Sequence, residues 1–212
     1  MGVASLLRET LYKAKRYLQD KEEGKNPPYD IDLEALIPVI KKEIPLKAHA
    51  HRAHDILSAI RIAQELDVDL TLDHCTEGII IADDIAKYDY TAIVGPSFGS
   101  KSKPELQYKS FKTPAVLQKA GVKICITTDA SVTPVETLPL CAGLAISAGL
   151  DEDEAWKAIT INPAETIKIA DRVGSLEVGK DADIVVWNNN PLRIIGAKPV
   201  LTVIDGKIVY KA

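Results

Sequence analysis

Three residues of this sequence stand where side chains could hold a metal ion and move a proton. His49 closes the apolar run IPLKAH, His74 closes VDLTLDH, and Asp129 follows VKICITT. If these runs are parallel strands, their carboxyl ends meet at one rim, where imidazole and carboxylate groups can share a divalent cation. A carboxylate at such a rim can also accept a proton from an attacking water. We therefore predict a metal and acid–base site made by His49, His74 and Asp129.

The neighbouring histidines invite weaker predictions. His51 shares a face with His49 if the strand continues, so we expect it to contact the substrate or a ligand residue. His54 falls on the following helix and is expected to stand outside the site. The structural alternatives are an exposed histidine-rich turn around His49 and a turn or helix-capping aspartate at Asp129.

Two acidic residues beside His74 also have competing interpretations. Glu77 is expected to cap a helix rather than bind metal, whereas Asp73 could orient an imidazole, although strand neighbours point to opposite faces. The long segment GPSFGSKSKPELQYKS is expected to form a pocket loop, with Tyr108 and Lys109 as pocket residues. Ser131, Thr133 and Pro134 are expected to build the loop after Asp129, where they could contact a substrate.

Strand-like and helical patterns alternate along most of the chain. After two amino-terminal helices, with Asp30 or Asp32 capping the second, short apolar runs alternate with amphipathic stretches. Repeated strand–helix units predict a parallel sheet with helices outside it, and four such units amount to half of a (β/α)8 barrel. The predicted helices are 4–19, 33–42, 55–66, 78–88, 113–120 and 135–148, and the predicted strands are 46–49, 69–73, 91–94 and 123–127.

Two further helices are expected before the pattern changes. Asp151 opens DEDEAWKAIT, with acidic residues in the first turn, where the helix dipole favours them. Asn162 is expected to cap the next helix and Pro163 to take its first position. Beyond Gly174, the segments GSLEVGKDADIVVWN and KPVLTVIDGKIVYKA read as strands, and the Asp205-Gly206 pair predicts a hairpin.

The predicted fold class is thus α/β, the second half of a (β/α)8 barrel followed by strands of a small β-sandwich. We assign residues 1–172 to a partial barrel domain with two amino-terminal helices, four strand–helix units and two more helices. Residues 173–212 are assigned to the strands of a small composite sheet.

Composition excludes several classes of partner. The net charge of −4 gives no electrostatic reason to expect nucleic acid or an acidic membrane, and no apolar stretch approaches the length of a membrane span. The three cysteines are odd in number and form no paired motif, which predicts a reducing, cytoplasmic location. The amphipathic amino terminus is expected to be a helix rather than a secretory signal.

Four segments carry a family resemblance. PLKAHAHRAHDI, LTLDHCTEG, GVKICITTDASVTP and INPAETIKIADRVGSLEVGKDADIVVWNNNPL resemble the imidazolonepropionase-like, metal-dependent amidohydrolases, from about Ile31 to the end. The resemblance implies hydrolysis of a carbon–nitrogen bond in a small molecule, often cyclic or peptide-like, by water that a divalent metal activates, with zinc as the expected ion. It also implies that His49, His74 and Asp129 match the ligands of the fifth, sixth and eighth barrel strands.

The chain departs from that family in one respect. The family's His-x-His pair on the first strand has no counterpart, because no histidine precedes His49, and a fourth-strand lysine ligand is also missing. Half a barrel is expected to leave two open strand edges and a wide apolar surface. Three explanations fit: a fragment of a longer enzyme, a short chain that closes a barrel with itself or a second chain, or an inactive scaffold or oligomerisation module. This chain alone is therefore expected to be an incomplete enzyme.

Overall fold

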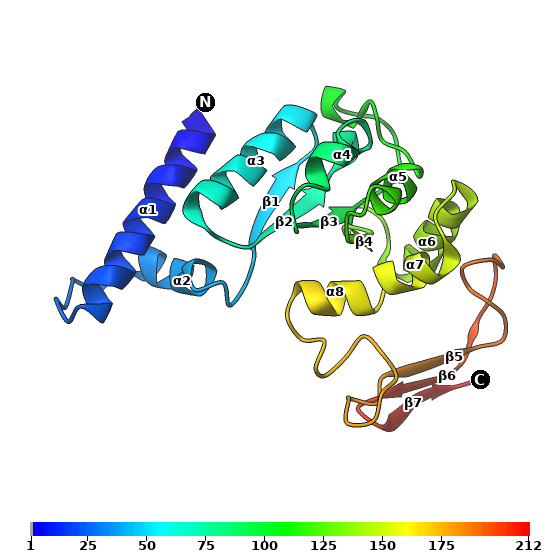
Figure 1. The fold of residues 1–212 in the computed structure, drawn as a ribbon. Helices are drawn as coiled ribbons and strands as arrows, with labels where there is room; N and C mark the ends of the chain where they lie inside the picture. The colour runs from blue at the N-terminus through cyan, green and yellow to red at the C-terminus, as the bar shows by residue number, and fades with distance from the viewer. Residues whose placement is uncertain (1) are drawn as a thin grey trace.

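The computed structural model describes residues 2–212, which form an α/β fold with two separate sheets (Figure 1). The elements up to the middle of the chain are α1 (Gly2–Glu22), α2 (Ile31–Ile40), β1 (Leu46–Ala50), α3 (Ala53–Leu66), β2 (Leu70–His74), the 3₁₀ helix η1 (Thr76–Ile80), α4 (Ala82–Ile85) and β3 (Thr91–Val94). They continue with η2 (Pro104–Leu106), α5 (Thr113–Lys119), β4 (Ile124–Ile126), η3 (Val135–Thr137), α6 (Leu138–Ser147), α7 (Glu152–Ala158), α8 (Ile161–Thr166), β5 (Ile184–Trp187), β6 (Pro199–Ile204) and β7 (Lys207–Lys211).

The larger sheet contains four strands in the order β1-β2-β3-β4, and all of its pairs are parallel. Each strand connects to the next through a segment that contains a helix, which is the usual crossover between parallel neighbours. The prediction of a parallel sheet built from successive strand–helix units is confirmed, and the predicted strand Thr91–Val94 coincides with β3.

The hydrophobic core lies between this sheet and the helices α3, α4 and α5, which lie along one of its faces (Figure 1). In α3, Ile56, Ile60 and Ala63 recur at helical spacing and are almost completely buried. They belong to the same cluster as Leu72 of β2 and Ile124 of β4. The helical layer therefore holds the strands in place from one side.

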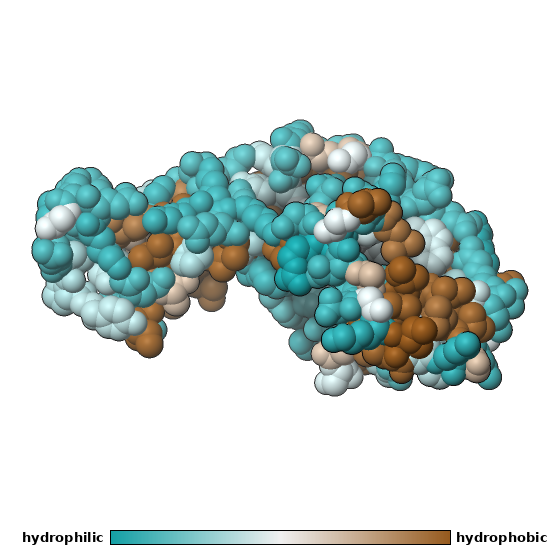
Figure 2. Space-filling model, turned by 90° about the horizontal axis from the view of Figure 1, so that it is seen from below, coloured by the Kyte–Doolittle hydropathy of each residue, from teal (hydrophilic) through white to brown (hydrophobic). Residues whose placement is uncertain are grey.

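The other face of the sheet is polar on β1 and β2. Lys47 and His49 are exposed, and the Lys47 ammonium lies 3.0 Å from the Asp73 carboxylate. Figure 2 shows the molecule from below: the largest continuous hydrophobic area lies at the right, where β5–β7 lie, and the middle is mainly hydrophilic. The wide apolar surface expected of an open sheet therefore does not lie on these two strands.

Of the two amino-terminal helices, α1 is longer than the predicted helix 4–19, and α2 begins and ends two residues before the predicted helix 33–42. α1 buries Leu11, Ala14 and Tyr17, and the Tyr17 hydroxyl donates to Glu34 of α2 over 2.7 Å. The predicted cap is confirmed, because the Asp30 carboxylate accepts from two backbone N–H groups at the start of α2. Within residues 2–212, no helix combines the length and apolar character needed to cross a bilayer.

Three predicted elements are interrupted in the structure. The helix expected over 78–88 is split into η1 and α4. The helix expected over 135–148 begins as η3 and becomes α-helical only at Leu138. The strand expected from Gly174 is limited to β5, because Gly174 and Gly179 adopt positive φ angles that belong to turns.

The prediction that Asn162 caps a helix is wrong. α8 begins at Ile161 with Thr160 in the cap position, so Asn162 and Pro163 lie one position further inside than expected. The buried Asn162 amide instead donates to the carbonyl of Ile124 in β4 over 2.9 Å. Because β4 lies at the edge of the sheet, this carbonyl needs a partner other than a strand, and Asn162 supplies it.

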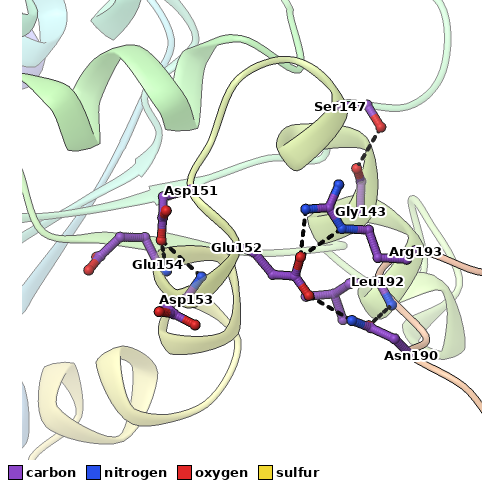
Figure 3. A network of polar contacts seen from close by, with 9 residues as sticks. All are labelled: Gly143, Ser147, Asp151, Glu152, Asp153, Glu154, Asn190, Leu192 and Arg193. Carbon is purple, nitrogen blue, oxygen red and sulfur yellow. Dashed lines mark hydrogen bonds and ion pairs between the residues drawn. The ribbon is translucent and has the colours of Figure 1, made fainter.

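The smaller sheet is antiparallel, in the order β5-β6-β7, and the predicted Asp205-Gly206 hairpin is confirmed. The segment after β5 is tied to the helices by Glu152 of α7, whose carboxylate accepts from Asn190 at 2.6 Å and from Arg193 at 2.7 Å (Figure 3). Asp151 caps α7 as predicted. Gly143 of α6 allows the close approach, since a Cβ there would lie 2.3 Å from the carbonyl oxygen of Leu192.

We predict that Asn162→Ala lowers the free energy of unfolding by about 1–3 kcal/mol, because it leaves a buried carbonyl without a donor. Asn162→Asp should cost at least as much, since a carboxylate cannot donate. The measurement is urea unfolding followed by circular dichroism. Asn189→Ala, at an exposed position, is the matched control. An Asn162→Ala protein as stable as the control would contradict this role.

Candidate metal centre

The predicted residues come together because the four parallel strands end side by side. Ala50 of β1 lies opposite His74 of β2, which in turn lies opposite Val94 of β3. Val94 lies opposite Ile126 of β4, three residues before Asp129. The residues that follow these positions therefore surround one cavity at the carboxyl ends of the strands.

Three imidazole rings form the centre of this cavity. The ring centroids of His49 and His74 lie 4.3 Å apart, those of His51 and His74 4.7 Å, and those of His49 and His51 4.9 Å. One nitrogen of each ring lies within 4.8 Å of the others. Tetrahedral zinc needs ligand nitrogens about 3.3 Å apart, since Zn–N bonds measure about 2.0–2.1 Å. The 3.1 Å between His74 Nε2 and His49 Nδ1 meets this requirement.

A hydrogen bond on the side of the ring away from His49 determines the orientation of His74. Its Nδ1 lies 2.7 Å from the carbonyl oxygen of Gly95. A carbonyl can only accept, so Nδ1 donates, and the neutral ring carries its lone pair on Nε2, which faces His49. Gly95 is required at this point, since a Cβ there would lie 2.2 Å from the carbonyl oxygen of Thr127.

His51 enters the cluster although its predicted role was a contact with the substrate or with a ligand residue. Its Nδ1 lies 2.8 Å from the hydroxyl oxygen of Thr76. The pKa of His51 is lowered to about 4, mainly because burial removes the ring from water. The neighbouring imidazoles of His74 and His49 lower it further. The ring is therefore neutral at neutral pH, as a metal ligand must be. His54 stays outside, exposed beside Asp55.

Asp129 lines the same cavity from the loop after β4. Its backbone N–H donates to the Thr127 hydroxyl over 3.1 Å, and its carbonyl accepts from the Val132 N–H over 2.7 Å. Within residues 2–212, the group of mutually close ligand atoms contains the three imidazoles and not this carboxylate. Asp129 thus lines the cavity without joining the group of mutually close imidazole nitrogens.

That space has a volume of about 640 Å³, and its walls come from the loops after β3 and β4. Lys109 lines it, whereas the exposed Tyr108 is not among the lining residues. The Lys109 ammonium donates to the carbonyl of Phe98, and burial lowers the pKa of Lys109. Of the residues expected to build the loop after Asp129, Thr133 and Pro134 line the cavity.

The acidic and thiol side chains next to His74 have other partners. The Asp73 carboxylate lies 3.0 Å from the Lys47 ammonium and accepts from the Thr71 hydroxyl over 3.2 Å, so its partners are these two residues rather than an imidazole. Glu77 does act as a helix cap, but for α3, because its carboxylate accepts from the backbone N–H of Ala53 over 2.8 Å. Cys75 is completely buried, and desolvation raises its pKa to about 12, which makes its thiol a poor nucleophile.

The backbone around these side chains is strained. His74 (φ 72°), Cys75 (φ 48°) and Asp129 (φ 49°) adopt left-handed conformations, which are unfavourable for residues with a Cβ, by about 1–2 kcal/mol each. Such conformations persist where the surrounding structure enforces them and are frequent at functional sites. Two of the eight non-glycine residues with positive φ in the described chain, His74 and Asp129, thus line this cavity, and a third, Cys75, directly follows His74.

Comparison with known proteins agrees with this geometry. Residues 41–209 match the family described as "Amidohydrolase family". Amidohydrolase tasK of Hapsidospora irregularis is 26% identical over 185 residues, which cover 84% of this chain and 19% of that protein. The imidazolonepropionase of Maricaulis maris is 30% identical over 172 residues, covering 74% of this chain and 40% of that protein. The chain therefore spans less than half the length of these relatives.

Solved structures show the same fold. An amidohydrolase from Thermotoga maritima MSB8 superposes with a TM-score of 0.93 at 37% identity, covering 100% of this chain and 56% of that one. A Xaa-Pro dipeptidase with bound methionine gives a TM-score of 0.64 at 21% identity, covering 85% of this chain and 48% of that one. The second similarity supports the fold alone.

The lowered pKa of His51 predicts a specific pH dependence of stability. The unfolded chain binds a proton at this residue near the usual value of 6.5, whereas the folded chain binds it only near 4. The unfolded state therefore holds more protons between these values, and stability falls as the pH drops from about 6.5 to about 4. Urea unfolding across this range should show a smaller loss in His51→Asn than in the unsubstituted chain. His54→Asn, outside the cluster, should keep the full loss, and equal slopes in all three proteins would contradict the prediction.

Proposed function

Because the chain belongs to the amidohydrolase family, we propose that it provides the metal-binding side of a hydrolase that cleaves carbon–nitrogen bonds. One observation carries the proposal: three imidazoles and Asp129 line a single cavity at the carboxyl ends of four parallel strands. This is the face on which enzymes built from such strand–helix units place their chemistry.

The residues around the cavity suit a divalent cation, and we propose zinc, because nitrogen-rich sites of tetrahedral spacing favour it. His49, His74 and Asp129 would hold the ion, with His51 beside them. When bound, such an ion lowers the pKa of water and polarises a carbonyl group. Asp129 would accept a proton from the attacking water on a carboxylate oxygen and pass it to the leaving nitrogen. The hydrogen bond from His74 Nδ1 to the Gly95 carbonyl keeps Nε2 directed to the cavity throughout.

The proposed substrate is a small molecule with an amide, cyclic amide or peptide-like bond. Relatives named imidazolonepropionase support this class. A cavity of about 640 Å³ lies within the range of small-molecule sites. We also propose a cytoplasmic location, since the three cysteines are free and buried.

We further propose that the four-stranded sheet is half of a closed (β/α)8 barrel, with residues 1–172 as the barrel part and 173–212 as part of a composite sheet. Within residues 2–212, β1 and β4 each have one edge that pairs with no strand, and the Thermotoga maritima structure contains chain beyond the part that this sequence matches. Further strand–helix units would belong to a longer protein, to a second chain or to another copy of this one. The alternative function is an inactive scaffold or oligomerisation module, which the open edges and the apolar area over β5–β7 also suit.

Zinc titration of the 212-residue chain tests the metal site. We expect weak or sub-stoichiometric zinc binding that is lost in His49→Asn and in His74→Asn and retained in His54→Asn. The reason is that the rings of His49 and His74 belong to the imidazole cluster, whereas the ring of His54 does not. Unchanged binding in both cluster variants would overturn the proposed site.

Where hydrolysis is measurable, Asp129→Asn should lower kcat by about 100-fold or more, as expected for loss of a proton-transferring group. Full zinc occupancy with activity that Asp129→Asn abolishes would instead show that this chain is a complete enzyme.

The mass in solution tests completion by self-association. If copies of this chain close the barrel, light scattering after size exclusion should give at least twice the chain mass of 23.1 kDa at micromolar concentration. The reason is that two unpaired edges and an exposed apolar area favour association. A stable monomer over a wide concentration range would rule out this form of completion.

A further inference from the structure

We propose that Thr76 and Glu77 are positioning residues that hold His51 in the imidazole cluster as a third nitrogen ligand. The proposal rests on the metal site proposed above. It assigns a function to two residues that directly follow the β2 turn, which consists of His74 and Cys75 at the end of strand β2. Both residues contact the short segment 51–53, and they do so through three separate hydrogen bonds.

The first contact fixes the ring. Thr76 is 7% exposed, and its hydroxyl oxygen lies 2.8 Å from His51 Nδ1. A hydroxyl can accept a hydrogen bond from a protonated Nδ1, which leaves the lone pair of the neutral ring on Nε2. The ring of His51 stacks on that of His74 at 18°, so the two rings are held as a parallel pair. An oxygen behind a ligating imidazole fixes both its tautomer and its direction.

The other two contacts fix the backbone on both sides of the ring. The N–H of Glu77 donates to the carbonyl of His51 over 2.8 Å, and the Glu77 carboxylate accepts from the N–H of Ala53 over 2.8 Å. Ala53 is the first residue of α3, and Arg52, in the cap position, makes no side-chain capping bond. Glu77 therefore supplies the missing cap from a different element, and its negative charge suits the helix start.

The β2 turn explains why these residues reach His51 at all. His74 and Cys75 are both left-handed, and the Cys75 N–H donates to the carbonyl of Ala50 over 3.1 Å. This directs the chain across the end of β1. Gly78 permits close packing behind the turn, because a Cβ there would lie 2.5 Å from the Cys75 sulfur. One turn thus carries one imidazole of the cluster and holds a second.

The test is a zinc titration of the full chain in competition with a chromophoric chelator. Thr76→Val keeps the shape of the side chain but removes the hydroxyl, and it should weaken zinc binding by about 10–100-fold, as loss of a partner behind a metal-bound histidine does. Thr76→Ser should restore binding, and Glu77→Ala should weaken it. His51→Asn should weaken it at least as much as Thr76→Val, whereas His54→Asn should not. Circular dichroism checks that each variant is folded.

Each outcome decides a separate question. Zinc binding in Thr76→Val equal to that of the unsubstituted chain would overturn the role of Thr76. Unchanged binding in His51→Asn, with binding lost in His49→Asn, would overturn His51 as a ligand and leave the proposed function intact. Binding that depends on none of the three histidines would overturn the proposed function itself. The imidazole ¹⁵N shifts of the zinc-free chain provide a second readout: removal of the hydroxyl should shift the His51 signals, and unaltered signals would show that Thr76 does not hold the ring.

Discussion

The candidate centre depends on the in-register parallel pairing of four strands. Parallel pairing places every carboxyl end at the same edge, and the register aligns Ala50 with His74 and His74 with Val94. A shift of one residue in β1 would turn His49 towards the helical layer, because successive side chains point to opposite faces. Hydrophobic residues on the helix-facing side, such as Leu72, oppose such a shift, since it would bring polar neighbours into the core. The buried side of the sheet thereby determines the position of the histidine-bearing rim.

Much of this arrangement could be predicted because it depends on local chemistry. Apolar runs of strand length with amphipathic stretches between them indicate a parallel sheet, whatever the later packing. Carboxylates before a helix start, as at Asp30 and Asp151, bind the free N–H groups of the first turn. The Asp205-Gly206 turn follows from the backbone conformations that these two residues tolerate. His49 and His74 could be placed at one rim because each stands at the end of its strand.

The remaining features depend on contacts between distant segments. Asn162 precedes a proline and has a typical capping side chain, but the unpaired carbonyl of Ile124 draws its amide into the core. Nothing local distinguishes Thr76 from any other residue at the start of a helix, because its partner, His51, lies on the preceding strand–helix unit. The left-handed turn at His74 and Cys75 could not be predicted from the sequence either, since neither residue is a glycine. Positions of this kind follow only from the assembled sheet.

The location of the core explains how these contacts can be maintained beside an open sheet face. The fully buried side chains of α3 and β2, such as Ile60 and Leu72, lie between the sheet and its helical layer, whereas the opposite face of β1 and β2 carries ions such as Lys47 and Asp73. Most of the hydrophobic free energy that orders the strands therefore comes from the helix side. The hydrogen bonds that orient His51 and His74 belong to the strand ends and the adjoining turns, and none of them requires a group from across the open face. The imidazole cluster is consequently preorganised by contacts within the described residues alone.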